Sequence, residues 1–261
     1  MKEINIKSIE HLIRELNELP NNYIYRGHSD TTWRLQSTLE RVLGNKYISH
    51  SREFEKYAIE NFSSRFHLYN DSNVLTDSKL EWLSIMQHYG VPTRLLDFTT
   101  SPYVALYFAI ENIRKTDDGV FDIYALNYRE LLNKSLDYIK KQNNTIQATY
   151  EDLFYERNKL FTTIDEGLYE ILWVVEPNIL NLRLERQSGC FLIAGSTNKT
   201  IEQILINDIY SGINNYRFIV PSKFWGNIYT LLQRMNIDSK TIYGDLEGLS
   251  KGIRLFMQAY S

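Results

Sequence analysis

The chain has 261 residues, of which 43% are hydrophobic, so it can form one large domain, or one domain with an appended lobe, around a sizeable core. Its net charge of −3 gives no overall attraction to nucleic acid or to membranes. The single cysteine, Cys190, excludes an intramolecular disulfide and a thiolate zinc site. No apolar run approaches the roughly 20 residues of a transmembrane helix. The acid-containing start, "MKEINIKSIEHLIRELNEL", is unlike a signal or transit peptide, and with the lone cysteine it predicts a cytoplasmic protein.

The first half of the chain is predicted to contain helices and two short strands. Ser8 is a predicted N-cap, Ser78 and Glu81 form a predicted capping box, and Ser101 before Pro102 is typical of a helix start. Apolar residues recur at helical spacing after each of these signals. The predicted helices cover residues 8–19, 52–69, 79–89 and 102–113, and the predicted strands cover 23–27 and 93–98.

The second half of the chain contains most of the predicted strands. They cover residues 120–128, 169–177, 189–195, 216–221 and 240–246, with a helix at 224–236. An Asp/Gly turn in "YGDLEGLSKGIR" leads to a final helix. The segment 129–168 is polar and charged, which predicts a helical insertion or lid. The predicted class is α+β, with a helical N-terminal half.

Two blocks of the sequence carry a resemblance to a known family. "YIYRGHSDTTWRLQSTLER" and "LEWLSIMQHYGVPTRLLDFTTSPYVALYFAIEN" resemble the FRG domain family, named for its Phe/Tyr-Arg-Gly motif, which here is Tyr25-Arg26-Gly27. "RLERQSGCFLI" and "IYGDLEGLSKGIR" resemble weaker motifs of the same family. The resemblance covers most of the chain outside 129–168, and it implies a single FRG-like domain over residues 1–261.

A second, looser resemblance is to mono-ADP-ribosyltransferases of the Arg–Ser–Glu type. Those enzymes carry an aromatic-Arg-Gly motif on an early strand and hydroxyl residues at the end of a later one; here these are Tyr25-Arg26-Gly27 and Thr99-Thr100-Ser101. The resemblance implies a mixed or antiparallel sheet core of the ADP-ribosyltransferase fold. The third element, a Gln/Glu-x-Glu pair, differs: Gln187-Ser188-Gly189 places glycine where the catalytic glutamate is expected, and Glu185 is the best substitute.

This resemblance implies NAD as substrate, because cleavage of the nicotinamide–ribose bond passes through an oxocarbenium-like state that a carboxylate or amide stabilises. Arg26 is the expected pyrophosphate anchor, since a guanidinium binds phosphate oxygens bidentately, and Gly27 would allow close backbone approach. The other implied site residues are Thr99, Thr100 and Ser101 for the ribose, Tyr25, Tyr89 and Tyr103 for ring stacking, His28, His88 and Asp97 for further contacts, and Glu185, Glu247 and, more weakly, Gln187 for the charge.

The same residues have structural interpretations. Arg26 shares a strand face with Ile24, so it points inward, where an ion pair with Asp97 would tie two strands together. Ser101 fits an ordinary N-cap, and His88 complements the negative end of a helix dipole. The sequence leaves both interpretations open for Arg26.

Two functions follow from the resemblances. The first is an NAD-binding effector that transfers ADP-ribose to a protein or nucleic-acid target, or hydrolyses NAD, in a toxin or anti-phage defence setting. The second is a non-enzymatic sensor that binds a nucleotide, a nucleic acid or a phage protein; Gly189 favours this one. An antitoxin or a phage protein is the expected partner. The five histidines lack paired metal-ligand spacing, so no metal is expected.

Overall fold

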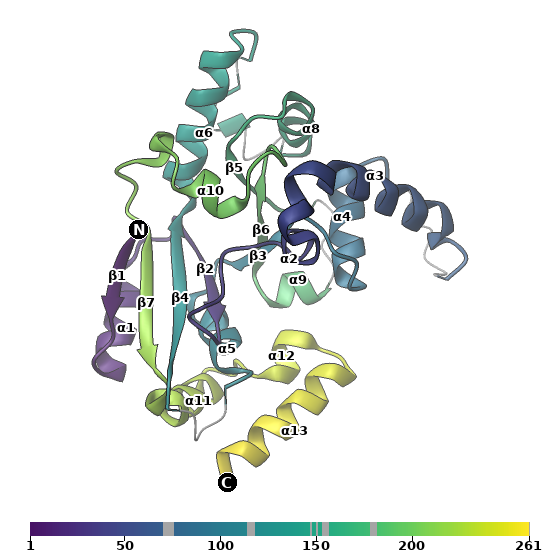
Figure 1. Ribbon diagram of the computed structural model, residues 1–261. Helices are drawn as coiled ribbons and strands as arrows, with labels where there is room; N and C mark the ends of the chain where they lie inside the picture. The colour runs from purple at the N-terminus through teal and green to yellow at the C-terminus, as the bar shows by residue number, and fades with distance from the viewer. Residues whose placement is uncertain are drawn as a thin grey trace.

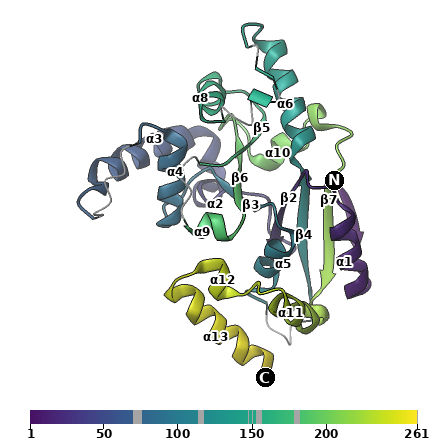
Figure 2. The ribbon, with the colours of Figure 1, turned by 180° about the vertical axis from the view of Figure 1, so that it is seen from behind.

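The computed structural model describes residues 1–69, 76–113, 118–146, 148–149, 151–152, 157–177 and 182–260, with only the backbone described at 157–159 and 260. The described chain has an α+β fold around a seven-stranded sheet with the strand order β1-β7-β4-β2-β3-β6-β5. β1 and β7 are parallel, and the other described strand pairs are antiparallel. Helices lie around both halves of this mixed sheet (Figures 1 and 2).

The strands are β1 (Lys2–Asn5), β2 (Tyr23–His28), β3 (Leu96–Thr99), β4 (Val120–Asn127), β5 (Leu172–Val175), β6 (Gly189–Ala194) and β7 (Tyr216–Pro221). The α-helices are α1 (Ile9–Glu18), α2 (Thr38–Leu43), α3 (Tyr47–Phe66), α4 (Lys79–His88), α5 (Pro102–Ile110), α6 (Tyr128–Gln142), α8 (Arg157–Gly167), α9 (Leu182–Arg186), α10 (Ile201–Leu205), α11 (Trp225–Arg234), α12 (Ser239–Tyr243) and α13 (Leu246–Tyr260).

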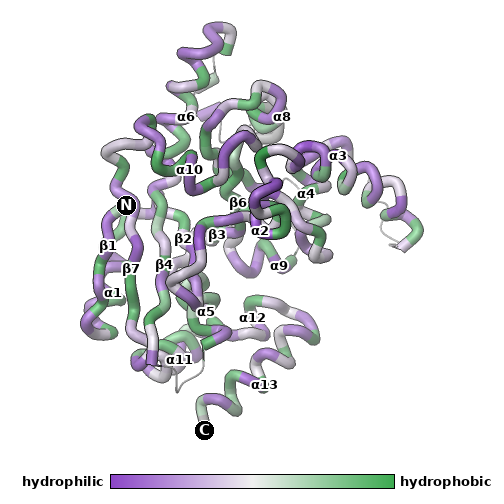
Figure 3. Tube along the Cα trace, viewed as in Figure 1, coloured by the Kyte–Doolittle hydropathy of each residue, from purple (hydrophilic) through white to green (hydrophobic). Residues whose placement is uncertain are grey.

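Alternate residues of the strands enter different parts of the core. Tyr23 and Tyr25 of β2 belong to a buried cluster with α1, α5 and α11, whereas Ile24 belongs to a cluster on the other face with β3, β6 and α10. A third cluster joins α4, α6 and α8 to β5 and β6. Figure 3 shows hydrophobic residues gathered where the strands and α5 lie.

The sheet separates at the seam between β2 and β3. These strands are neighbours, yet their register contains the single pair Tyr25–Thr99. By contrast, β2 pairs with β4 along its whole length, and β3 does so with β6. Beyond Tyr25 the backbones of β2 and β3 are therefore free to diverge, and this divergence creates space in the middle of the sheet.

Gly27 sets the distance between β2 and α5. A Cβ atom at this position would lie 2.0 Å from the carbonyl oxygen of Ala105 and 2.7 Å from the amide nitrogen of Ala109. Both are backbone atoms, so they cannot move aside as a side chain can. The space that the sequence assigned to ligand approach is occupied by the helix, which explains why the Tyr-Arg-Gly motif requires glycine.

A buried ionic cluster joins α3, α4 and α8 below the seam. Arg94 is fully buried; its Nε lies 2.8 Å from Glu55 Oε2, and its Nη2 donates to Asp165. Lys79 Nζ completes the cluster at 2.7 Å from Glu55 and 2.8 Å from Asp165. The cluster therefore anchors the segment leading into β3.

The predicted α+β class is confirmed, and strands are found in the predicted regions 23–27, 120–128, 169–177, 189–195 and 216–221. Two predictions are wrong. Residues 240–246 are not a strand: Asp238 caps α12 and Gly244 ends it with φ +71°, so capping outweighs the β-favouring Ile242 and Tyr243. The helices are also not concentrated in the N-terminal half, since α6 to α13 follow residue 127.

The segment 129–168 is helical in its described parts. Leu131, Leu132 and Leu136 of α6 are buried, as are Phe161 and Ile164 of α8, so both helices contribute to the core. None of the described residues that line the cleft discussed below comes from this segment. That this segment acts as a lid stays a prediction.

Substitution Gly27→Ala is expected to destabilise the protein by about 3 kcal/mol, the upper range for overpacking, because the new methyl group meets backbone. Chemical denaturation measures this. Gly226→Ala in α11 is the matched control: its Cβ would meet nothing within 4 Å, so it should be neutral or stabilise by up to about 1 kcal/mol. Equal effects of the two substitutions would contradict the close packing of β2 on α5.

Substitution Asp165→Asn is expected to cost about 3–5 kcal/mol, because it leaves Arg94 buried with incomplete charge compensation. Burial alone would raise the pKa of Asp165, but Arg94 and Lys79 hold it below its ordinary value. The stabilisation is therefore present above the ordinary carboxyl pKa of 3.8 and is lost as the pH falls towards the lower folded value.

Denaturation as a function of pH tests this. The wild type should lose stability in acid more steeply than Asp165→Asn, with the exposed neighbour Glu166→Gln as control. Identical acid profiles for wild type and Asp165→Asn would show that the cluster does not hold a charged Asp165.

Candidate functional site

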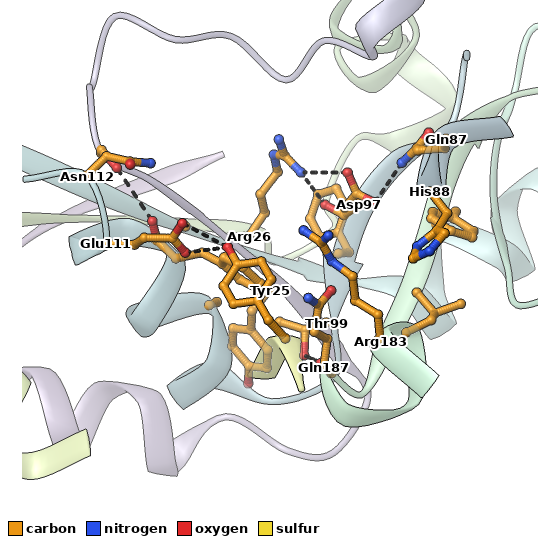
Figure 4. A pocket seen from close by; sticks show the side chains of 18 of the residues that line it. Tyr25, Arg26, Gln87, His88, Asp97, Thr99, Glu111, Asn112, Arg183 and Gln187 are labelled. Atoms are coloured by element: carbon orange, nitrogen blue, oxygen red, sulfur yellow. Dashed lines mark hydrogen bonds and ion pairs between the residues drawn. The ribbon is translucent and has the colours of Figure 1, made fainter. Parts of the chain in front are cut away.

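A cavity of about 520 Å³ opens at the seam between β2 and β3, and we call it the cleft. One wall comes from β2, α5 and α12, and the other from α4, β3 and the α9–β6 segment. The residues that line it are Tyr25, Arg26, Gly27, Ser29, Trp33, Ser84, Gln87, His88, Gly90, Asp97, Phe98, Thr99, Ala105, Phe108, Glu111, Asn112, Arg183, Leu184, Gln187, Phe191 and Tyr243. Figure 4 shows the cleft from close by.

Arg26 spans the seam. Its Nη1 donates to the carbonyl oxygen of Asp97 at 2.5 Å and lies 3.9 Å from the Asp97 carboxylate. Its Nε donates to His28 Nε2 at 2.9 Å. The side chain is 19% exposed, so the guanidinium is held firmly and still reaches the cleft (Figure 4). The predicted contact with Asp97 is confirmed, and it coexists with a cavity.

His28 fixes the guanidinium from behind. It is the last residue of β2 and is buried, so it does not lie on an exposed loop. Burial and the nearby Arg26 lower the pKa of its imidazole to about 3. The neutral ring accepts the hydrogen bond from Arg26 at Nε2. Its own proton is therefore on Nδ1, which lies 3.9 Å from Asp122 Oδ1.

Asp122 continues this polar row across the sheet. Burial raises the pKa of its carboxyl to about 6, although Arg217 acts in the opposite direction. Arg217 Nε donates to Asp122 Oδ2 at 2.6 Å, and Arg217 Nη1 lies 3.1 Å from Glu3. The row of polar residues on β2, β4, β7 and β1 therefore extends from the cleft to the edge of the sheet, and it orients Arg26.

Gln87 and Asp97 form the wall opposite α5. The Gln87 amide donates from Nε2 to Asp97 Oδ1 at 2.6 Å, and Thr93 Oγ1 donates to its carbonyl oxygen. The amide thus has a fixed orientation, and it directs the exposed Asp97 carboxylate towards Arg26 (Figure 4). This places a carboxylate and a guanidinium side by side at the mouth of the cleft.

The hydroxyls that the sequence analysis assigned to ribose binding are engaged in hydrogen bonds within the protein. Thr99 Oγ1 donates to the carbonyl oxygen of Gln187 at 2.6 Å, and the Thr100 backbone and hydroxyl both donate to Ser188. Ser101 accepts from the Val104 amide as the N-cap of α5, which confirms its structural interpretation. The Thr99 and Thr100 hydroxyls therefore position Gln187, whose side-chain nitrogen Nε2 has no hydrogen-bond partner among the described residues.

Arg183 enters the cleft from α9. Its Nη1 lies 3.3 Å from Glu247 Oε2, and its guanidinium stacks over the Tyr243 ring at 4.6 Å. Figure 4 shows Arg183 extending between Gln187 and Asp97 towards Arg26. The cleft therefore contains a second guanidinium, which the sequence did not single out.

Glu111 forms the inner wall at the end of α5. Its carboxylate is buried, accepts from the Tyr243 hydroxyl at 2.6 Å and binds Lys251 Nζ at 2.6 Å. Burial, followed by the charge of Glu111, raises the pKa of Tyr243 far above its ordinary value, so the phenol stays protonated. This cluster ties α5 to α12 and α13 and gives the cleft a polar inner end.

The structure brings together seven residues singled out from the sequence: Tyr25, Arg26, Gly27, His88, Asp97, Thr99 and Gln187. Six others are not among the lining residues: His28 lies behind Arg26, Tyr89 lines another cavity, Tyr103 bonds to Asn17, and Thr100, Ser101 and Glu185 only follow lining residues in the sequence. Glu247 contacts it only through Arg183. Sequence reasoning missed Gln87, Glu111, Asn112, Arg183 and Tyr243; the family-like blocks contain all five, which was the available signal.

Two kinds of site are not found in the described part of the chain. No group of three or more His, Cys, Asp or Glu residues there has metal-binding geometry. No described helix has the length and apolar character that crossing a membrane requires. Cys190 is buried in β6.

The imidazole of His28 is expected to stay neutral, with its proton on Nδ1, between about pH 5 and 8, where ordinary histidines change charge. Nitrogen NMR of the ring, assigned with the His28→Gln variant, measures this directly. A His28 signal that titrates within this range would contradict the hydrogen bond that orients Arg26.

Comparison with known proteins gives one match. No curated protein and no solved structure matches the chain. The model of the FRG domain family matches residues 21–118, a range that contains β2, α4, β3 and α5 and therefore much of the cleft. Residues 21–118 are therefore similar to FRG domains.

Proposed function

We propose that the cleft binds NAD and that the protein cleaves its nicotinamide–ribose bond, passing ADP-ribose to water or to a macromolecular acceptor. The observation that carries this proposal is the convergence of three distant segments. The strand with Arg26, the strand with Thr99 and the strand that follows Gln187 are adjacent in the sheet, in the order β2-β3-β6. These are the three segments that the resemblance to ADP-ribosyltransferases requires at one site.

The charges in the cleft favour a ligand with a pyrophosphate. Arg26 is preorganised by His28 and Asp97, so little entropy is lost when it binds phosphate oxygens. Arg183 supplies a second guanidinium from the opposite wall. A volume of about 520 Å³ lies in the range of small-molecule and cofactor sites.

The polar inner end suits the rest of a nucleotide. A buried carboxylate repels phosphate but accepts hydrogen bonds from ribose hydroxyls, and Glu111 with its neighbour Asn112 provides such acceptors. Tyr25 and Phe108 add aromatic surface on the same wall. The cleft therefore has a cationic mouth and an acceptor-rich inner end.

Bond cleavage releases nicotinamide as a neutral molecule, so no strong acid is required. Water or an acceptor hydroxyl or amine forms the new bond to the ribose carbon and gives up a proton. Asp97 is the exposed carboxylate of the cleft, and it can stabilise the positive ribose and receive that proton. In this proposal Asp97 supplies the negative charge that the resemblance assigns to a glutamate at the position of Gly189.

A second function is favoured by one observation. Glu185 does not line the cleft, and Gly189 begins β6, so no glutamate lies at the position of the family-like motif. A cleft with two arginines and no catalytic glutamate fits a binding module that senses a nucleotide. Binding is common to both functions, and turnover separates them.

Arg26→Ala is expected to weaken NAD binding by about tenfold or more, since a charged hydrogen bond contributes about 1.5–3 kcal/mol. Titration calorimetry with NAD measures the affinity, and adenylate-labelled NAD, with and without cell lysate, reports nicotinamide release and label transfer. Arg14→Ala, at an exposed arginine of α1, is the control, and thermal melting verifies the fold of each variant.

The outcomes are distinct. Binding and cleavage that Arg26→Ala abolishes and Arg14→Ala leaves unchanged would support the enzyme. Binding without cleavage under all conditions would support the sensor, and absence of NAD binding by the wild type would refute both. The toxin or anti-phage setting is tested separately: toxicity on expression should disappear with Arg26→Ala.

A further inference from the structure

The inner end of the cleft is formed by Glu111 and Asn112, at the end of α5, and by Tyr243 of α12. Glu111 is the C-cap residue of α5, and it is only 4% exposed although it lines the cleft. Asn112 follows it and is exposed. A buried carboxylate at a cavity wall requires hydrogen-bond donors, so this end restricts the ligand groups that the cleft can accept.

The protein satisfies the Glu111 carboxylate only in part. Lys251 Nζ binds Oε1 at 2.6 Å, and the Tyr243 hydroxyl lies 2.8 Å from Oε1 and 2.6 Å from Oε2. A hydroxyl has one proton to donate, whereas each carboxylate oxygen has two lone pairs. These two donors therefore leave Oε2 with at least one lone pair, which a hydroxyl group of a ligand in the cleft can use.

The charge that faces the cleft at this end is negative. Lys251 compensates Glu111, but Lys251 is not among the residues that line the cleft. The Tyr243 hydroxyl already donates to Glu111, so its proton is not available to a ligand. A ligand group at the inner end therefore meets the carboxylate first, and the ammonium group lies behind it.

Arg26 lies between the inner end and the opposite end of the cleft. Figure 4 shows Glu111 and Asn112 on one side of Arg26 and Asp97 on the other. A dinucleotide has its pyrophosphate between two nucleosides, so a pyrophosphate bound at Arg26 leaves one nucleoside for each end. The proposed function has the bond to nicotinamide break beside Asp97, and this leaves the adenosine for the inner end.

We infer that the inner end binds the adenosine ribose and that Glu111 selects NAD over NADP. This inference rests on the proposed function, because it takes the pyrophosphate to lie at Arg26. The adenosine ribose of NAD has a free 2′-hydroxyl, which donates to the Glu111 carboxylate. Dinucleotide-binding folds of another kind use an acidic residue for the same hydroxyl, and an arginine where a 2′-phosphate is bound instead.

The 2′-phosphate of NADP has the opposite chemistry. A phosphate monoester carries a charge of about −1.5 to −2 at pH 7 and offers acceptor oxygens. At the inner end it would lie against the Glu111 carboxylate, and it would displace the hydroxyl that donates to Oε2. Among the described residues that line the cleft, the guanidinium groups are those of Arg26 and Arg183, and the proposed function assigns both to the pyrophosphate.

Titration calorimetry of the full chain with NAD and with NADP tests this. The wild type should bind NAD about tenfold or more tightly than NADP, since the loss of a charge-assisted hydrogen bond has this effect on affinity. Glu111→Gln should remove most of this preference, because an amide accepts from a hydroxyl and also donates to a phosphate. Inorganic pyrophosphate, which has no ribose, should bind both proteins equally.

Lys251→Met is the matched control for Glu111→Gln. It breaks the same ion pair but keeps the carboxylate, so it should retain the preference for NAD. A purely structural role of the pair predicts the same effect for both substitutions. Thermal melting verifies that each variant is folded.

Asn112→Arg is a second test, and it changes an exposed residue, so it does not depend on how the buried pair tolerates substitution. A guanidinium beside the 2′ position should raise the affinity for NADP relative to NAD by about tenfold, from one charge-assisted hydrogen bond. Asn198→Arg is its control, because it adds the same charge at an exposed position outside the cleft.

The outcomes separate this inference from the proposed function. Equal affinities of the wild type for NAD and NADP would overturn the inference and leave the proposed function standing. Loss of the preference in Lys251→Met as in Glu111→Gln, or no gain of NADP binding in Asn112→Arg, would also overturn it. If the wild type binds neither dinucleotide, the proposed function fails and the inference fails with it.

Discussion

The arrangement of the cleft depends on one guanidinium that bridges a divided sheet. β2 and β3 share a single register pair, and beyond it Arg26 supplies the connection, through the Asp97 carbonyl oxygen on one side and His28 on the other. A backbone ladder would have closed the seam, whereas a side-chain bridge leaves it open to a ligand. The cost of holding a charge there is met by a neutral imidazole and a nearby carboxylate. Structural and functional interpretations of Arg26 are therefore compatible, because the contacts that stabilise it also preorganise it.

Gly27 and Arg26 are adjacent in β2, so their side-chain positions lie on opposite faces of the sheet. The missing side chain at Gly27 lets α5 approach β2 to backbone contact, and this places Glu111 and Asn112 at the inner end of the cleft. The long side chain at Arg26 extends into the seam. Adjacent residues of a strand face opposite sides of a sheet, so the motif sets both the wall and the mouth of the cleft.

The sequence predicted local features well and distant ones poorly. The Arg26–Asp97 contact followed from strand alternation and the need of a buried charge for a partner, and the Ser101 cap followed from its neighbour Pro102. The strand predicted at 240–246 failed because Ile242 favours a strand in isolation, while the Asp238 cap and Gly244 act through the helix they delimit. Arg183 and Glu111 were missed because no local pattern indicates that α9 and the end of α5 meet across the sheet.

The helix α13 holds two charged residues of the cleft in place. Its first turn carries Glu247, whose carboxylate holds Arg183 over the Tyr243 ring in the cleft, while Leu249 and Ile253 face outwards. Lys251, between them in sequence, binds both Glu247 and the buried Glu111. The same helix therefore positions both Arg183 and Glu111. Because these contacts exist before a ligand arrives, they lower the entropy that the two side chains would lose on binding it.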